Sequence, residues 1–269
     1  MALCSEYLGC SPKHLAPYAQ DGRLLYQQCA DCGIIWRDPQ SFDLEQPYDQ
    51  QYFDSKNYQH NRAHKITKST WLLDLALSHH PRIQRLLEVG CSVGNTLEAA
   101  QQKGIPHLGI DVSEFAVDYC TKRGLEATTQ SLPDLIAQSQ RFDLIFMQHV
   151  LEHFVDPFQV LQQCNQLLNN QGLVLILIPN SQYKRARKLR ERHKFYSIQG
   201  VGIEHYAYFN YQNLERVLNA TGYTVIQNNY PLSTLNHDSP SFIINRLGRR
   251  LLSLLGLDQE LVVLSQKRN

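Results

Sequence analysis

Short apolar runs alternate with amphipathic segments along the chain from about residue 60 onward. The runs consist almost entirely of apolar residues, as is typical of strands covered on both faces, and lie at 85–90, 107–111, 126–129, 142–147 and 172–179. Between them, apolar residues at helical spacing occur at 94–103, 114–123, 131–139 and 156–169. Such alternation predicts an α/β fold, with a parallel sheet covered by helices on both faces.

The flanking regions divide the chain into three predicted parts. Residues 1–38 hold two short strand candidates around a Cys29-x-x-Cys32 turn, so we expect a small ribbon there. Residues 39–59 are polar and rich in Tyr, Pro and Asp, which is typical of a linker. The third part, 60–269, adds a helical pattern at 60–81, a helix at 211–222 and strands at 223–230 and 260–266.

The strand predicted at 85–90 runs into a turn that contains two glycines. Gly90 and Gly94 precede a helix, so a ligand can approach the backbone N–H groups at its N-terminus. Asp111 ends the next strand, 17 residues after Gly94, where a carboxylate accepts hydrogen bonds from both hydroxyls of a ribose. The pattern predicts a ribose-containing ligand. The alternative is that the glycines make only a tight turn and Asp111 only caps a helix.

Six successive motifs resemble those of class I S-adenosylmethionine-dependent methyltransferases. They are E-x-G-C-x-x-G at 88–94, GIDVS at 109–113, FDLI at 142–145, LEH-x-x-DP at 151–157, GLVL at 172–175 with PN at 179–180, and EHY at 204–206. The resemblance covers roughly 60–269. It implies an enzyme with a Rossmann-like seven-stranded sheet, mostly parallel with the last strand antiparallel, and a small N-terminal zinc-ribbon-like segment.

The same resemblance assigns residues to the cofactor. In such enzymes the glycine turn holds the methionine moiety, the acid after the second strand holds the ribose, and residues after the third strand flank the adenine. Carried over to this sequence, the cofactor-binding residues are Glu88, Gly90, Cys91, Gly94, Asp111, Val112, Gln130, Ser131, Leu132, Met147 and Gln148.

Polar residues follow the fourth strand of the predicted sheet, where side chains reach the ligand crevice. His149, Glu152 and His153 stand at i, i+3 and i+4, so they share one face if they lie on a helical turn. An imidazole titrates near neutral pH, which makes His149 or His153 a candidate base. The three are also candidate ligands of a divalent metal ion, or braces for neighbouring loops. The motif resembles that of ubiquinone-pathway O-methyltransferases, which have a carboxylate, Glu and His at these positions.

The catalytic candidates are His149, His153 and His205. We expect the acceptor pocket between three segments: the turn at 147–153, the EHY motif at 204–206 and the linker from Tyr48 to Tyr58. Methyl transfer from a sulfonium requires alignment more than side-chain chemistry, so a base matters only where the acceptor must lose a proton.

Four of the seven cysteines crowd the first 32 residues. Cys29-x-x-Cys32-Gly33 has the spacing of a metal knuckle, and Cys4 and Cys10 complete a candidate tetrahedral Zn²⁺ site. Cys4 and Cys10 are spaced more widely than usual, so His14 is an alternative ligand. We expect a structural zinc ion; vestigial thiols and redox chemistry are the alternatives.

The composition and charge of the chain limit the classes of partner that it can be expected to bind. A net charge of +1 gives no overall field that attracts nucleic acid, and no apolar run reaches the roughly 18 residues that span a bilayer. With no signal-peptide pattern at residues 1–10, we expect a cytoplasmic protein. The basic run at 184–194 suits an anionic, nucleotide-linked or carrier-linked acceptor, or is a solvated helix face.

Three functions remain open. The first is transfer of a methyl group to a small-molecule or carrier-linked acceptor, with O- or C-methylation favoured over N-methylation. An NAD-dependent oxidoreductase would share the glycine turn and Asp111, but the third glycine of the dinucleotide fingerprint is missing. A non-catalytic interaction protein would use the ribbon for docking. Binding of S-adenosylmethionine or of NAD distinguishes these possibilities.

Overall fold

A computed structural model describes residues 3–21, 24–38, 50–55, 61–182, 205–228 and 260–268. The chain forms two compact units. The first unit comprises Met1–Leu44, Leu151–Val160 and Ile176–Val263, and the second comprises Glu45–Val150, Leu161–Leu175 and Leu264–Asn269.

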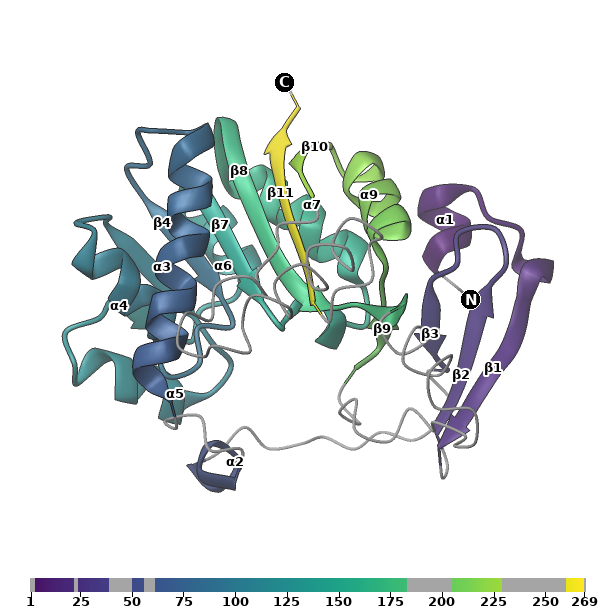
Figure 1. Cartoon of the computed structure of the whole chain (residues 1–269), viewed down its shortest axis with the longest axis horizontal. Helices are drawn as coiled ribbons and strands as arrows, with labels where there is room; N and C mark the ends of the chain where they lie inside the picture. The colour runs from purple at the N-terminus through teal and green to yellow at the C-terminus, as the bar shows by residue number, and fades with distance from the viewer. Residues whose placement is uncertain are drawn as a thin grey trace, which may run out of the picture. The chain divides into compact units, whose positions relative to one another are not determined.

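Seven strands form the larger sheet, in the order β10-β11-β8-β7-β4-β5-β6 (Figure 1). Their bounds are β4 Leu86–Val89, β5 His107–Ile110, β6 Ala127–Thr128, β7 Phe142–Gln148, β8 Leu168–Pro179, β10 Tyr223–Gln227 and β11 Glu260–Lys267. β4 pairs in parallel with β5 and β7, and β5 pairs in parallel with β6. The predicted sheet is therefore confirmed, mostly parallel with its last strand antiparallel.

The apolar runs became strands because both faces of the sheet are covered. All four residues of β4 are buried, as are the first six of β7 and the stretch 172–178 of β8. Helices follow the predicted segments: α3 Arg62–His79, α4 Asn95–Gln102, α5 Glu114–Thr121, α6 Leu132–Ala137, α7 Pro157–Leu167 and α9 Tyr211–Ala220. Reciprocal side-chain and backbone hydrogen bonds fix the starts of two of them, Ser131 with Asp134 at α6 and Asn210 with Asn213 at α9.

The N-terminal ribbon is part of a second, four-stranded sheet of order β1-β2-β3-β9 (Figure 1). β1 (Leu15–Asp21), β2 (Leu24–Cys29) and β3 (Ile35–Arg37) pair antiparallel in sequence order, and β9 (Ala207–Tyr208) pairs antiparallel with β3. The sequence predicted β2 and β3 but not the pairing with β9. A helix, α1 (Leu3–Leu8), and two 3₁₀ turns, η1 (Pro12–His14) and η2 (Leu151–His153), complete the first unit's short elements.

Several sequence features lie outside the described residues: Tyr48, Tyr58, the basic run at 184–194, Glu204 and the basic stretch at 242–255. Of the predicted linker, the structure describes a single helical segment, α2 (Gln50–Ser55). The division of the chain at residues 38 and 59 stays a prediction. Among the described residues, none of the helices has the length and apolar character that a bilayer-spanning segment needs.

Candidate functional site

The glycine turn of the second unit has a backbone that few residue types adopt. Gly90 and Gly94 have φ angles of 69° and 73°, and Ser92 between them has 50°. A Cβ atom added at Gly90 would stand 2.5 Å from Val150 Cγ2, and one at Gly94 would stand 2.7 Å from Cys120 Sγ. Both positions therefore require glycine for space as well as for conformation.

Asp111 is fixed directly against this turn. Its Oδ2 accepts the backbone N–H of Ser92 at 2.8 Å, and its Oδ1 accepts that of Ser113 at 2.9 Å. Burial raises the pKa of the Asp111 carboxyl, and the two N–H donors partly offset that effect. Because a carboxylate offers about four acceptor positions, each oxygen retains one for a ligand hydroxyl. The structure thus brings Asp111 against the glycine turn, and its role as a ribose acceptor stays a prediction.

Glu88, in β4, is almost fully buried, with 4% of its surface exposed. Burial raises the pKa of its carboxyl well above the ordinary range, and a hydrogen bond with Thr96 opposes the shift. Its Oε2 has no hydrogen-bond partner within the described parts of the chain. A buried acceptor with spare capacity next to the turn fits the ammonium group of an amino acid ligand.

Two cysteines pack behind the turn. Cys91 and Cys120 are buried, and the hydrogen bond between their side chains, together with burial, raises the pKa of the Cys91 thiol. A thiol with a raised pKa is a poor nucleophile, so Cys91 contributes bulk and backbone rather than reactivity. Arg123 stands in no sequence motif, yet it donates to the carbonyl oxygen of Val93 at 3.0 Å and forms an ion pair with Glu98.

The residues predicted to flank an adenine follow β6, whose neighbour in the sheet is β5. Asp111 donates its N–H to Thr128 O at 3.2 Å, so this loop begins beside the Asp111 backbone. Ser131 and Leu132 begin α6, where the Ser131 hydroxyl donates to Asp134 at 2.6 Å. Val112, which follows Asp111, is 80% exposed. A large apolar side chain left this open next to a polar site suits contact with a flat ligand ring.

The α2 segment of the linker belongs to the same unit. Tyr52 and Phe53 are buried in a cluster with Val93 of the glycine turn and Ala116 of α5. The Phe53 and Phe115 rings lie 5.5 Å apart. Aromatic side chains from the linker thus pack against Val93, the residue that precedes the second glycine of the turn.

The first unit holds a compact polar cluster. One ligand-type atom from each of Glu152, His153 and His205 lies within 4.8 Å of the others. His205 Nε2 lies 3.9 Å from Glu152 Oε1, and the His153 and His205 rings meet edge to face with centroids 4.6 Å apart. His153 Nδ1 is buried without a hydrogen-bond partner among the described residues. Such a set can move a proton or ligate a divalent metal ion.

The expectation that His149, Glu152 and His153 share a helical face does not match the backbone. His149 has a left-handed φ of 54° and precedes η2, which begins at Leu151, so it is not on that turn. The third member of the cluster is instead His205, from the EHY motif far along the chain. Met147 and Gln148 are the last two residues of β7, and Met147 lies opposite Val89 in the parallel register.

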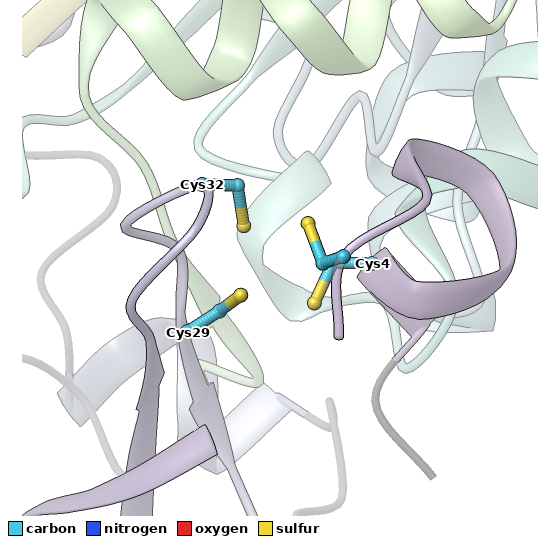
Figure 2. Close-up of side chains that lie close together, drawn as sticks. Cys4, Cys29 and Cys32 are labelled. Atoms are coloured by element: carbon cyan, nitrogen blue, oxygen red, sulfur yellow. The ribbon is translucent and has the colours of Figure 1, made fainter. Parts of the chain in front are cut away.

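The four N-terminal cysteines converge, as their spacing predicted. The four Sγ atoms of Cys4, Cys10, Cys29 and Cys32 all lie within 4.8 Å of one another, and Figure 2 shows the sulfurs of the three labelled residues pointing toward one another. All four are buried and none forms a disulfide. The helix α1 between Cys4 and Cys10 explains how their wide spacing still brings both sulfurs to one point. Four thiols in this arrangement match the donor set of a tetrahedral zinc site.

His14 does not replace a cysteine in this cluster. Its Nδ1 lies 2.7 Å from Asp31 Oδ1, and its side chain is 55% exposed. The second Asp31 oxygen accepts the Ser11 N–H at 2.8 Å. These bonds lower the pKa of the Asp31 carboxyl, with the His14 contact as the largest cause. The alternative ligand is thus used to brace the loop beside the knuckle.

Comparison with known proteins gives matches to the methyltransferase domain family and to individual methyltransferases. The family profile matches residues 58–228. Ubiquinone biosynthesis O-methyltransferases from Methylococcus capsulatus and Leptothrix cholodnii are 33% and 31% identical over 108 and 100 residues, which are 38% and 34% of this chain. These matches cover 46% and 43% of the relatives, so the chain spans about half the length of the curated relatives it matches.

Solved structures share the fold. A SAM-dependent methyltransferase from Archaeoglobus fulgidus has a TM-score of 0.51 at 18% identity, covering 81% of this chain and 100% of that chain. A plantazolicin methyltransferase in complex with SAH has a TM-score of 0.57 at 15% identity, covering 82% and 90%. At such identity, the likeness establishes the fold alone.

Proposed function

This chain belongs to the methyltransferase domain family, and we propose that it transfers the methyl group of S-adenosylmethionine to a small-molecule acceptor. The observation that carries the proposal is the Asp111 carboxylate, fixed by two backbone N–H groups against a turn built on two obligatory glycines. When bound, the sulfonium cofactor supplies an activated methyl group, so the protein has to bind, orient and exclude water.

The second unit is proposed to hold the cofactor. Asp111 accepts the ribose hydroxyls, the turn from Gly90 to Gly94 offers backbone N–H groups to the amino acid end, and Glu88 accepts its ammonium. The loop residues Gln130, Ser131 and Leu132 and the exposed Val112 flank the adenine ring. Cys91, Met147 and Gln148 complete the lining of this site.

The first unit is proposed to act on the acceptor. His153 and His205 are the candidate bases, and the Glu152 carboxylate orients the His205 ring at 3.9 Å. His149, which belongs to the second unit, is a third candidate, held in a left-handed conformation after β7. A base here removes a proton from a hydroxyl or an acidic carbon, which favours O- or C-methylation over N-methylation. The named relatives are O-methyltransferases, and this supports an oxygen acceptor.

A structural Zn²⁺ ion is proposed at Cys4, Cys10, Cys29 and Cys32. The four buried sulfurs supply a complete tetrahedral set, which leaves no position for a substrate, so this ion stabilises the ribbon and takes no part in methyl transfer. We further propose that the acceptor is a free or carrier-linked small molecule, anionic if the basic run at 184–194 faces it, and that the protein works in the cytoplasm.

Calorimetric titration tests the proposal directly. The wild-type protein is titrated with S-adenosylmethionine, S-adenosylhomocysteine and NAD in parallel. Binding of the first two, with no heat from NAD, supports a methyltransferase and excludes the oxidoreductase. Binding of NAD alone would overturn the proposal. Failure of all three to bind would favour the non-catalytic interaction protein.

A further inference from the structure

The ribbon and the histidine cluster are joined by consecutive backbone pairings inside the first unit. The knuckle residue Cys29 ends β2, and Cys32 lies in the turn that leads to β3. β3 then pairs with β9, with Ile35 opposite Tyr208 and Trp36 opposite Ala207. The pairing continues beyond β9, because Arg37 donates its N–H to Tyr206 O at 2.8 Å.

Arg37 also holds Tyr206 through its side chain. The guanidinium carbon lies 3.6 Å from the centroid of the Tyr206 ring, and only 6% of the Arg37 surface is exposed. A desolvated guanidinium over an aromatic face is a stronger contact than an exposed one. In the same four-stranded sheet, the Tyr26 ring of β2 meets the Tyr208 ring of β9 edge to face at 5.8 Å. The segment that follows His205 is therefore anchored to the ribbon by backbone and side chains.

The other side of this segment contacts the catalytic candidates. Tyr206 donates its N–H to Glu152 O at 2.8 Å, so a single residue is hydrogen-bonded both to η2 and to the ribbon. His205, the preceding residue, meets Glu152, His153 and Tyr208. The positions of the two imidazoles thus depend on where Tyr206 is held.

We propose that the N-terminal ribbon is the positioning element of the histidine cluster, and that Arg37 is the residue through which it acts. A metal ion at the four cysteines fixes the turn between β2 and β3. That turn sets β3, and β3 sets Tyr206 and hence His205 and Glu152. The ribbon thereby acts on acceptor chemistry without contacting the acceptor. The inference rests on the proposed function for the role of the histidines, whereas the mechanical link itself is independent of it.

The test measures the NMR signals of the His153 and His205 imidazole rings and does not depend on turnover. Nuclear magnetic resonance of protein labelled with ¹⁵N-histidine reports each ring, and His153→Gln and His205→Gln identify the two signals. Spectra are compared for the zinc-loaded wild type, the same protein after chelation, and the variants Arg37→Ala and Arg37→Lys. Arg216→Ala is the matched control, because the Arg216 guanidinium also binds the ribbon, at Asp31 O at 2.8 Å, but no contact joins it to Tyr206 in the described structure.

Chelation and Arg37→Ala are expected to shift or broaden the His153 and His205 signals, with partial rescue by Arg37→Lys. Signals of His64 and His79, which lie on α3, should stay in place, as should the His153 and His205 signals in Arg216→Ala. The calorimetric affinity for S-adenosylmethionine should change by less than about twofold, because Arg37 and the four cysteines belong to the first unit, whereas the proposed ribose and methionine contacts belong to the second. If Arg37→Ala does not fold, Tyr206→Leu removes the same stacking from the other side.

Unchanged His153 and His205 signals after chelation and in the Arg37 or Tyr206 variant would overturn the inference. Equal shifts in Arg216→Ala would also overturn it, since they would reflect general loosening of the ribbon. The proposed function fails differently. If S-adenosylmethionine does not bind while the two imidazole signals still respond to Arg37, the mechanical link stands and the methyltransferase proposal does not.

Discussion

The backbone N–H of Ser92 donates to Oδ2 of Asp111 at 2.8 Å, which ties the glycine turn to the end of the neighbouring strand. Ser92, which lies between the two glycines, thus fixes the orientation of the Asp111 carboxylate. The carboxylate in turn holds Ser92 at its left-handed φ of 50°. The methionine-binding and ribose-binding halves of the proposed cofactor site are therefore one rigid piece. Such preorganisation lowers the ordering cost of binding.

Asp111→Ala should weaken binding of S-adenosylmethionine by tenfold or more. The variant removes charge-assisted hydrogen bonds to two hydroxyls, each worth about 1.5–3 kcal/mol. Calorimetry measures the change, and Asp118→Ala, an exposed carboxylate on α5, is the control that should leave affinity unaltered. Unchanged affinity in Asp111→Ala would refute the ribose assignment.

Gly90→Ala should destabilise the protein, because the new methyl group meets Val150 Cγ2 at 2.5 Å and the backbone stays at a φ of 69°. Gly104→Ala measures the part of this loss that comes from the backbone conformation alone. Gly104 has the same φ, but the space around its Cβ position is open. We expect a loss of about 1 kcal/mol for Gly104→Ala and about 2–4 kcal/mol for Gly90→Ala. In urea denaturation, adding Val150→Ala should recover part of the Gly90→Ala loss. Equal losses at the two glycines would contradict the steric account.

The larger sheet could be predicted from sequence because its strands are buried on both faces. Runs such as 142–147 and 172–179 are apolar apart from Asp143, and that pattern is typical of strands covered on both faces. The pairing of β3 with β9 carried no such signal. β9 is two residues long, and its partner lies far away in sequence, so only the three-dimensional arrangement brings Trp36 opposite Ala207.

The candidate site was predictable where spacing alone determines geometry. Gly90, Gly94 and Asp111 follow two adjacent parallel strands, which places them together, and Cys29-x-x-Cys32 forms a knuckle by itself. The histidine cluster was predicted in part. A helical turn was assumed from His149, whereas the turn begins at Leu151, and the third member comes from the distant residue His205. Arg37 lay outside any motif, because its role depends on stacking over Tyr206.

The purified protein should contain about one zinc ion per chain, held by the N-terminal cysteines. Cys29→Ser should lose that zinc and lower the midpoint of thermal unfolding, since structural zinc contributes directly to folding free energy. Cys164→Ala is the matched control: it removes a fully buried thiol of α7, so it should lower stability while retaining the zinc. Elemental analysis under reducing conditions without chelator decides the matter, and absence of zinc from the wild type would exclude the site.

Glu88 should make stability depend on pH. Burial raises the pKa of its carboxyl, so between the ordinary pKa and the raised one the folded state holds a proton that the unfolded chain has released. Stability is therefore expected to fall as the pH rises through that interval. The amide in Glu88→Gln does not titrate in that interval. The difference in free energy of unfolding between the variant and the wild type should therefore shift in favour of the variant as the pH rises. Denaturation at several pH values measures this gain, and Glu215→Gln, which replaces an exposed carboxylate, is the control.

The histidines should affect turnover without affecting the cofactor. Once an acceptor is known, His153→Ala and His205→Ala should lower kcat by about 10²–10⁴, because removal of a base forfeits proton transfer but leaves the Asp111 and glycine contacts intact. His149→Ala tests the third candidate in the same assay, and the exposed His64→Ala is the control. Calorimetric affinity for S-adenosylmethionine should be unchanged in all four. A pure scaffold role predicts instead that stability and turnover fall together, and full turnover in all three catalytic-candidate variants would remove the histidines from the mechanism.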